Sequence, residues 1–216
     1  MTEVFAGNPR FFTFEGLDGS GKTTQLGMLA EFLRSDNIPV VAVREPGGTA
    51  LSDRIRSLLL SADHGITPEA EVLLFSAARA QLVSEVIGPA LSAGKVVLAD
   101  RFGWSTLAYQ GYGRGLDQGK ILPLFHVACG RIWPGHTFLL DLPVTEIRSR
   151  LQAGGRAPDR MEREKDAFFE KVRAGYLDIA RHNTANFTVL NSTLDPKVLQ
   201  DTIRLQVMVK LARGAV

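Results

Sequence analysis

The chain has 216 residues, of which 45% are hydrophobic and 22% charged, a composition typical of a folded globular protein and not of a disordered chain. Its net charge of +2 is too small to indicate by itself a surface that coats nucleic acid, and a single cysteine, Cys129, excludes an internal disulfide and a multi-cysteine zinc site. We therefore expect one cytoplasmic domain over residues 1–216, without a signal segment or the roughly 20 apolar residues of a membrane helix.

Short apolar runs recur along the chain and alternate with longer segments of helical spacing. The runs are apolar on both faces, as in strands that are covered on both sides, and they lie at 11–14, 40–43, 96–99, 137–140 and 187–190. Between them apolar residues recur at helical spacing, as from Leu26 to Leu33, and a last helix is expected after Pro196. This alternation predicts an α/β fold with three layers, in which helices cover a sheet of five parallel strands.

Charged residues stand at the ends of four of the predicted strands. Glu15, Arg44, Asp100 and Asp141 each come directly after an apolar run or close to its end. Ligands of parallel α/β sheets bind outside the carboxyl ends of the strands. We expect the functional site at this edge of the sheet.

The segment after the first predicted strand carries the strongest motif in the chain. Residues 16–23 fit the phosphate-loop pattern G-x-x-x-x-G-K-[ST] in full, between a strand and a helix. The glycines let backbone N–H groups surround phosphate oxygens, while Lys22 would reach the β- and γ-phosphates and the Thr23 hydroxyl would ligate Mg²⁺. A glycine-rich turn with a solvated lysine is the weaker interpretation. The residues expected to bind the nucleoside triphosphate are Gly16, Leu17, Asp18, Gly19, Ser20, Gly21, Lys22, Thr23 and Thr24.

The phosphate loop does not decide the reaction, because kinases, regulatory GTPases and motor ATPases share it. The chain has no Asn-Lys-x-Asp motif of the kind that reads guanine. A small nucleotide kinase needs a second anion pocket that faces the first, and a cover that excludes water. The remaining motifs have to supply both.

Five segments, in order, resemble the thymidylate kinase family of phosphate-loop kinases, bacterial type. They are the phosphate loop at 14–25 and the segments 44–49, 74–79, 100–110 and 159–162, so the resemblance runs from about residue 11 to about residue 180. It implies the transfer of a phosphoryl group from ATP to dTMP with Mg²⁺, a homodimer, and a lid at about 148–163.

The resemblance also implies an acceptor site. Phe75 and Arg79 lie four residues apart and so share one face of a helix. The ring of Phe75 would stack on thymine, and Arg79 would donate to the O4 carbonyl of the base. Without the flanking motif, a core Phe75 and a surface Arg79 would be the simpler interpretation. The set of residues implied for dTMP is Asp18, Arg44, Phe75, Arg79, Arg101, Ser105, Tyr109 and Gln110.

Within this set the family assigns individual roles. Arg101 would hold the acceptor phosphate, for which a planar guanidinium is well suited. Asp18 would contact the 3′-hydroxyl, and Tyr109 would crowd out a ribose 2′-hydroxyl. Asp100 would work near Mg²⁺, through water; the alternative is a structural ion pair with Arg101.

The 148–163 segment is rich in arginine and contains a possible hinge at Gly154-Gly155. The phosphate loop itself carries no arginine, so charge on the transferring phosphoryl group has to be stabilised from elsewhere. We expect Arg156 to do so, with Arg150 and Arg160 as close competitors; a solvated helix end is the alternative. The predicted catalytic set is Lys22, Asp100, Arg101, Arg150, Arg156 and Arg160.

No general base is expected. A phosphomonoester carries about −1.5 to −2 charges at pH 7, so its oxygen is already nucleophilic, and catalysis consists of alignment and charge cancellation. The four histidines, His64, His126, His136 and His182, are interpreted as structural.

Several alternatives stay open at this point. A kinase of another monophosphate, such as dUMP or GMP, is the nearest one, and a nucleotide-sensing module without turnover belongs to a different class. A nucleic-acid-binding ATPase fits less well with the near-neutral charge. Residues 191–193, after the last strand, are candidates for contact with adenine.

Overall fold

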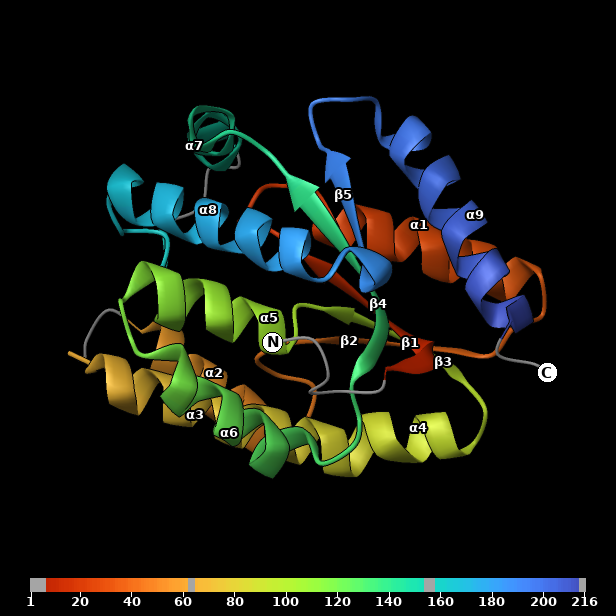
Figure 1. The fold of residues 1–216 in the computed structure, drawn as a ribbon, viewed down its shortest axis with the longest axis horizontal. Coiled ribbons are helices and arrows are strands. Elements are labelled where there is room, and N and C mark those ends of the chain that lie inside the picture. The colour runs from red at the N-terminus through yellow and green to blue at the C-terminus, as the bar shows by residue number, and fades with distance from the viewer. Residues whose placement is uncertain (1–6, 62–64, 154–157, 214–216) are drawn as a thin grey trace.

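The computed structural model describes residues 7–61, 65–153 and 158–213, and it has three layers with a sheet in the middle (Figure 1). The sheet of the described residues has five parallel strands in the order β2-β3-β1-β4-β5. The strands are β1 (Asn8–Glu15), β2 (Val40–Arg44), β3 (Val96–Asp100), β4 (Pro134–Asp141) and β5 (Phe187–Asn191). The five predicted strands and their parallel arrangement are confirmed, with ends that extend the predicted runs by one to three residues.

Helices connect the strands and continue in places into π-helical segments. The helices are α1 (Lys22–Ser35), α2 (Ala50–Leu60), α3 (Pro68–Leu82), α4 (Gly88–Ser92), α5 (Gly103–Thr106), α6 (Gln118–Cys129), α7 (Val144–Ala153), α8 (Asp166–His182) and α9 (Pro196–Arg213). The π-helical segment Val83–Ile87 joins α3 to α4, Leu107–Gly113 continues α5, and Thr184–Asn186 forms a 3₁₀ turn. In the part of the chain covered by the structure, no helix has the length and apolar character needed to cross a membrane.

The two faces of the sheet pack against different helices, because side chains alternate along a strand. Phe12 and Phe14 of β1 pack on the side of α1 and α9, where they meet Leu29 and Ile203. Phe11 points to the other face, which α3, α6 and α8 cover. Each of these phenylalanines is fully buried, so β1 is the centre of both cores.

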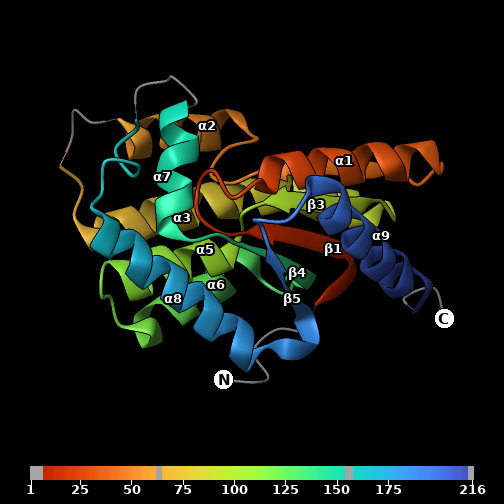
Figure 2. The same cartoon turned by 90° about the horizontal axis from the view of Figure 1, so that it is seen from above.

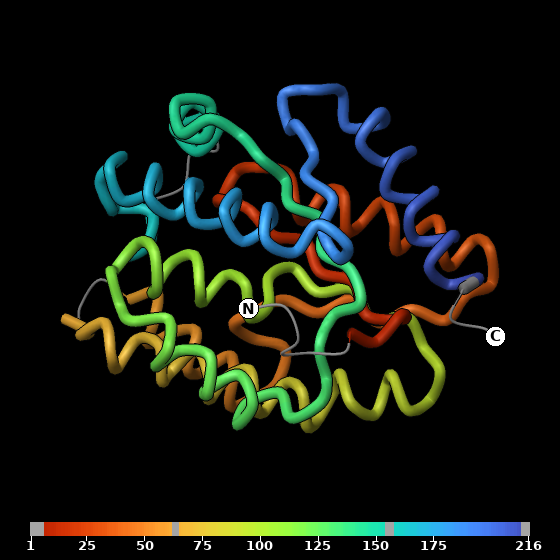
Figure 3. The backbone as a smooth tube through the Cα atoms, viewed as in Figure 1, coloured from red at the N-terminus to blue at the C-terminus, as the bar shows by residue number. Residues whose placement is uncertain are grey.

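The sheet order creates a switch point beside β1. From β1 the chain moves to β2 at one edge and returns to β3, and it then crosses to β4 and β5 on the other side (Figure 3). The register pairs Phe14 with Asp100, and Asp100 with Arg44. The predicted meeting of charged strand ends at one edge is therefore confirmed, and it places the loops after β1 and β3 next to each other.

Candidate active site

The phosphate loop connects β1 to α1 and is held in shape by its glycines. Gly16 has a φ of 135°, and a Cβ atom there would lie 2.5 Å from the Leu140 carbonyl oxygen, so only glycine fits. Lys22 begins α1 and is buried, and its Nζ donates to the Leu17 carbonyl oxygen over 2.8 Å. Burial, and then the charge of Arg101, lower the pKa of Lys22. The loop is a preformed cradle with a buried cation at its base.

A cavity opens in front of this loop. Its lining residues are Asp18, Gly19, Gly21, Lys22, Thr23, Thr24, Arg44, Glu45, Arg56, Asp100 and Arg101. We refer to it as the phosphate-loop cavity. Most of the predicted triphosphate residues lie here, together with Arg44, whose side chain is exposed.

Thr23 and Asp100 meet in this cavity. The Thr23 hydroxyl donates to Asp100 Oδ2 over 2.6 Å, although 77 residues separate the two in the chain. The Asp100 carboxylate thus accepts from Thr23, whereas the Arg101 guanidinium lies 2.9 Å from Asp18 Oδ1. A hydroxyl and a carboxylate oxygen side by side are the hard oxygen ligands that Mg²⁺ prefers.

Arg101 follows β3 in a left-handed backbone conformation, with a φ of 72°. Its Nη2 donates to Asp18 over 2.9 Å and its Nη1 to Ser105 over 3.1 Å, and the guanidinium lies 5.1 Å from the ring centre of Tyr109. Burial raises the pKa of Asp18, but the charges of Arg101 and Lys22 outweigh it and hold that pKa far below its usual range. Arg101 thus ties the phosphate loop to the segment after β3.

A buried carboxylate supports the Arg101 segment from behind. Glu15, the last residue of β1, accepts from the backbone N–H of Phe102 over 2.8 Å, from Ser105 Oγ over 2.5 Å and from the Tyr176 hydroxyl over 3.0 Å. Burial raises the pKa of Glu15. The sequence predicted Glu15 at the end of a strand but indicated no specific role for its carboxyl group. Tyr176 carries no local signal, because it reaches the site from α8, far along the chain.

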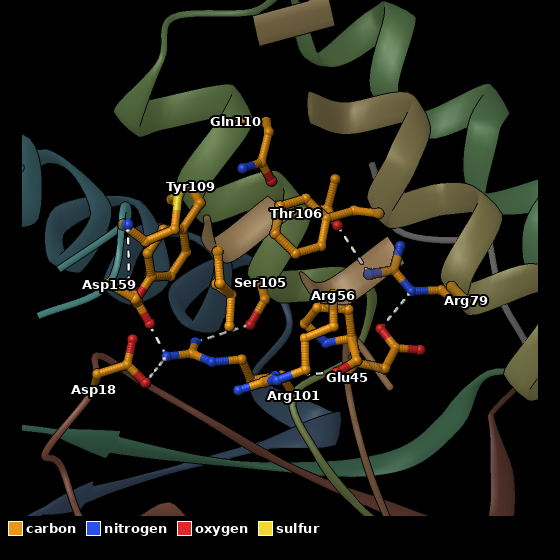
Figure 4. Close-up of a pocket in the computed structure, with 14 residues that line it drawn as sticks. Asp18, Glu45, Arg56, Arg79, Arg101, Ser105, Thr106, Tyr109, Gln110 and Asp159 are labelled. Carbon is orange, nitrogen blue, oxygen red and sulfur yellow. Dashed lines mark hydrogen bonds and ion pairs between the residues drawn. The ribbon is translucent and has the colours of Figure 1, made fainter. Parts of the chain in front are cut away.

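A second pocket adjoins the phosphate-loop cavity (Figure 4). We refer to it as the adjoining pocket. Its lining residues are Asp18, Glu45, Pro46, Arg56, Leu60, Phe75, Arg79, Arg101, Ser105, Thr106, Tyr109, Gln110, Asp159 and Met161. All of the predicted dTMP residues except Arg44 lie in it, and Arg44 lies in the neighbouring cavity.

Arg79 is buried against the adjoining pocket and does not lie on the surface. Only 1% of it is exposed, and its Nε donates to Glu45 Oε2 over 2.8 Å while Nη2 donates to Thr106 Oγ1 over 2.9 Å (Figure 4). Its Nη1 atom is buried and has no hydrogen-bond partner among the described residues. Phe75 lies one turn away on α3 and is half-buried. The aromatic ring of Phe75 and the guanidinium of Arg79 therefore line one pocket.

Sequence reasoning missed several lining residues. Arg56 of α2 lines both the cavity and the pocket, and its Nη1 donates to the Pro46 carbonyl oxygen over 3.0 Å. Glu45 also lines both, and it fixes Arg79. Arg56 stands outside every motif, so no local pattern in the sequence could have predicted that it lines the site. Glu45 stands inside a motif, but the sequence could not predict that it pairs with Arg79.

The arginines around α7 have different surroundings. α7 lies beside the phosphate loop (Figure 2), where Arg150 donates to the Gly19 carbonyl oxygen over 3.2 Å and to the Ser192 carbonyl oxygen over 3.0 Å. Arg160 instead donates to Glu71 Oε2 over 2.6 Å and to the Leu59 carbonyl oxygen over 2.7 Å, and it lines neither the cavity nor the pocket. Arg156 and the Gly154-Gly155 pair lie outside the described residues.

The described histidines lie away from the cavity and the pocket. His136 is buried on β4, where its Nε2 is 2.8 Å from Thr188 Oγ1, and burial lowers its pKa to about 4. His126 belongs to α6 and His182 ends α8. None of the three lines either space, and His64 lies outside the described residues.

Comparison with known proteins gives a consistent family. The family model described as thymidylate kinase matches residues 14–203. A thymidylate kinase of Syntrophotalea carbinolica is 49% identical over 193 residues, covering 86% of this chain and 89% of that protein. One of Thermomicrobium roseum is 44% identical over 204 residues, with coverages of 94% and 97%. A crystal structure of thymidylate kinase from Ehrlichia chaffeensis matches with a TM-score of 0.73 and 37% identity, covering 92% of this chain and 97% of that one. With its phosphate loop, its paired cavities and these relatives, the chain belongs to the thymidylate kinase family.

Proposed function

We propose that this kinase transfers the γ-phosphoryl group of ATP to dTMP, with the triphosphate in the phosphate-loop cavity and the monophosphate in the adjoining pocket. One observation carries the proposal: Asp18, Glu45, Arg56 and Arg101 line both spaces. Direct transfer requires donor and acceptor to meet in line, with positive charge around the transferring group. Membership of the thymidylate kinase family supports dTMP as the acceptor.

The donor side is built around Lys22. Its ammonium group donates to the Leu17 carbonyl oxygen and lies 3.8 Å from Asp18 Oδ1. When ATP binds, this group would turn to the β- and γ-phosphates. The loop glycines would offer backbone N–H groups to the same phosphates. Residues 191–193 stay candidates for adenine, supported by the contact between the Ser192 carbonyl and Arg150 beside the loop.

Magnesium fits the residues present. The Thr23 hydroxyl and the Asp100 carboxylate, 2.6 Å apart, would hold the ion, with Asp100 acting through water. Mg²⁺ is usually held by one or two protein oxygens together with substrate phosphates. When bound, it neutralises charge on the phosphate oxygens.

The acceptor side follows from the adjoining pocket. Phe75 would stack on the thymine ring, and the Arg79 guanidinium would donate to its O4 carbonyl. Tyr109 would lie against the sugar, and Asp18 would accept from the 3′-hydroxyl.

The acceptor phosphate would lie against Arg101, with Ser105 behind it and Arg44 and Arg56 on the neighbouring wall.

Catalysis then needs no general base. The dianionic acceptor phosphate is the nucleophile, and Lys22, Arg101 and Arg150 would cancel charge that develops on the transferring group. Among the described arginines predicted for the lid, Arg150 is the one beside the phosphate loop. Arg156 stays a prediction from the sequence. We keep the proposed lid at about 148–163, within a single domain that spans 1–216.

We also propose a homodimer that works in the cytoplasm, where a reduced and buried Cys129 is expected. The support is the family resemblance, together with four exposed apolar side chains on the neighbouring helices α2, α3 and α6: Leu51, Leu58, Leu73 and Val127 are 47–84% exposed. A second copy of the chain would cover these side chains. Light scattering of the purified protein should give twice the mass of the chain, and Leu73→Glu should lower it to that of one chain.

Phosphoryl transfer from ATP, measured against a panel of monophosphates, tests the function. We expect dTDP and ADP from dTMP with Mg²⁺, and far slower turnover of GMP. A faster reaction of dUMP or GMP would reassign the acceptor. Tight ATP binding without any diphosphate product would indicate a nucleotide-sensing module.

A further inference from the structure

Glu71 is a buried acid behind the adjoining pocket that the mechanism does not use. It lies in the first turn of α3 and is 1% exposed. Its Oε1 accepts from Gln110 Nε2 over 2.7 Å and from Arg114 Nε over 3.2 Å. Its Oε2 accepts from Arg160 Nη2 over 2.6 Å and from Arg114 Nη2 over 3.3 Å. Both carboxylate oxygens are therefore surrounded by donors.

This arrangement fixes which end of the Gln110 amide faces the pocket. A carboxylate can only accept hydrogen bonds. Burial raises the pKa of Glu71, but hydrogen bonds from Arg114 and Gln110 outweigh it and lower that pKa below its usual value, so the group stays ionised. A turned amide would place its oxygen 2.7 Å from Glu71 Oε1, where two acceptors repel. The amide nitrogen must face Glu71, and the oxygen points into the pocket (Figure 4).

The pocket then offers two groups of opposite character to a base. Gln110 presents an acceptor, its amide oxygen, and the guanidinium of Arg79, which lines the same pocket, carries only donors. Thymine and uracil match this pair, because they carry a ring N3–H next to the O4 carbonyl. Cytosine carries the reverse, an N3 acceptor next to a 4-amino donor. A buried polar group that meets a like group is penalised strongly.

We propose that Glu71 is a positioning residue that sets the base selectivity of the enzyme by locking the Gln110 amide with its oxygen toward the acceptor base. This inference rests on the proposed binding of the monophosphate in the adjoining pocket. Glu71 does not touch the substrate itself, and its influence passes through the Gln110 amide.

Glu71→Gln tests the proposal, because the new amide can donate as well as accept and so allows the Gln110 amide to turn. The kcat/KM values for dTMP, dUMP and dCMP are measured for the wild-type and variant enzymes. We expect the dTMP-to-dCMP ratio to fall by about tenfold or more, since one hydrogen bond to the base is at stake. The dTMP-to-dUMP ratio should stay constant, because both bases present the same edge. An unchanged dTMP-to-dCMP ratio in a folded Glu71→Gln enzyme would overturn the proposal.

Two further variants guard against a purely structural effect. Glu69→Gln changes an exposed acid on the same helix and should leave every ratio unchanged. The double variant Glu71→Gln with Gln110→Glu keeps the charge of the cluster and exchanges donor for acceptor, so it should restore the dTMP-to-dCMP ratio. If Glu71→Gln alone does not fold, a double variant that folds but does not discriminate against dCMP would also contradict the proposal. Failure of the proposed function itself would differ, because the wild-type enzyme would then not phosphorylate dTMP.

Discussion

The Arg101 guanidinium donates to the Asp18 carboxylate over 2.9 Å, across 83 residues of chain. Asp18 belongs to the phosphate loop and Arg101 to the segment after β3, so this ion pair joins the two spaces in which donor and acceptor are proposed to bind. Both partners line both spaces.

Arg101→Lys should separate charge from shape. Lysine keeps the positive charge but loses the planar fork that contacts Asp18 and Ser105 and that is proposed to hold the acceptor phosphate. We expect kcat/KM for dTMP to fall by roughly 10²-fold or more while the KM for ATP changes little. Steady-state kinetics with each substrate varied in turn measure both values. Arg131→Lys, at an exposed position, is the matched control, and equal losses for ATP and dTMP would argue against the assignment of Arg101 to the acceptor.

Phe75→Ala should act on the acceptor alone. The ring lines the adjoining pocket and not the phosphate-loop cavity, so its loss would remove the proposed stacking on the base. The expected result is a rise of about tenfold or more in the KM for dTMP, with a nearly constant KM for ATP. Initial rates measured over a range of dTMP concentrations and over a range of ATP concentrations give the two KM values. Equal changes in both constants would move Phe75 out of the base site.

Variants of the arginines predicted for the lid should differ from one another. Arg150→Ala removes a guanidinium next to the Gly19 carbonyl, and we expect kcat to fall by roughly 10²-fold or more. Arg160→Ala breaks a contact to Glu71 instead, and it should mainly raise the KM for dTMP. Arg156→Ala is expected from the sequence to lower kcat. If Arg156→Ala lowers kcat strongly and Arg150→Ala leaves it near normal, the choice of Arg150 from its position is wrong.

Thr23→Val should raise the Mg²⁺ concentration that gives half-maximal rate, because valine keeps the shape but loses the hydroxyl beside Asp100. Thr23→Ser keeps the hydroxyl and is the matched control. Rates measured over a Mg²⁺ titration at constant ATP distinguish the two variants. An identical Mg²⁺ dependence for Thr23→Val and Thr23→Ser would exclude Thr23 as a ligand.

His136 should make the protein less stable in mild acid. Its pKa in the folded chain is about 4 because of burial, against 6.5 as the reference value. Between these values the unfolded chain binds a proton that the folded chain does not, so the free energy of unfolding falls as the pH drops from 6.5 toward 4. The slope can reach about 1.4 kcal/mol per pH unit.

Urea unfolding of wild-type and His136→Gln proteins at several pH values between 4 and 7 measures this slope. The variant should show a flatter dependence. A His136→Gln protein with the wild-type slope would contradict the prediction.

Local patterns in the sequence determined the fold and the donor site. Each strand is a contiguous apolar run, and the phosphate loop is a contiguous motif whose shape follows from its own glycines. A parallel sheet brings the strand ends together, so the positions of Asp100 and Arg101 after a predicted strand were enough to assign both to the site. Phe75 and Arg79 needed the spacing of one helix turn and the family resemblance.

Only the tertiary structure decided which partner each buried charge takes. Glu45 holds Arg79, Tyr176 reaches Ser105 from α8, and Arg160 turns to Glu71 and away from the phosphate loop. These pairs join segments between 34 and 89 residues apart. Hydrophobic periodicity fixes which face of a helix is buried, but the partner of a polar side chain depends on how helices pack around the sheet. That packing is a property of the whole chain, and no short stretch of residues encodes it.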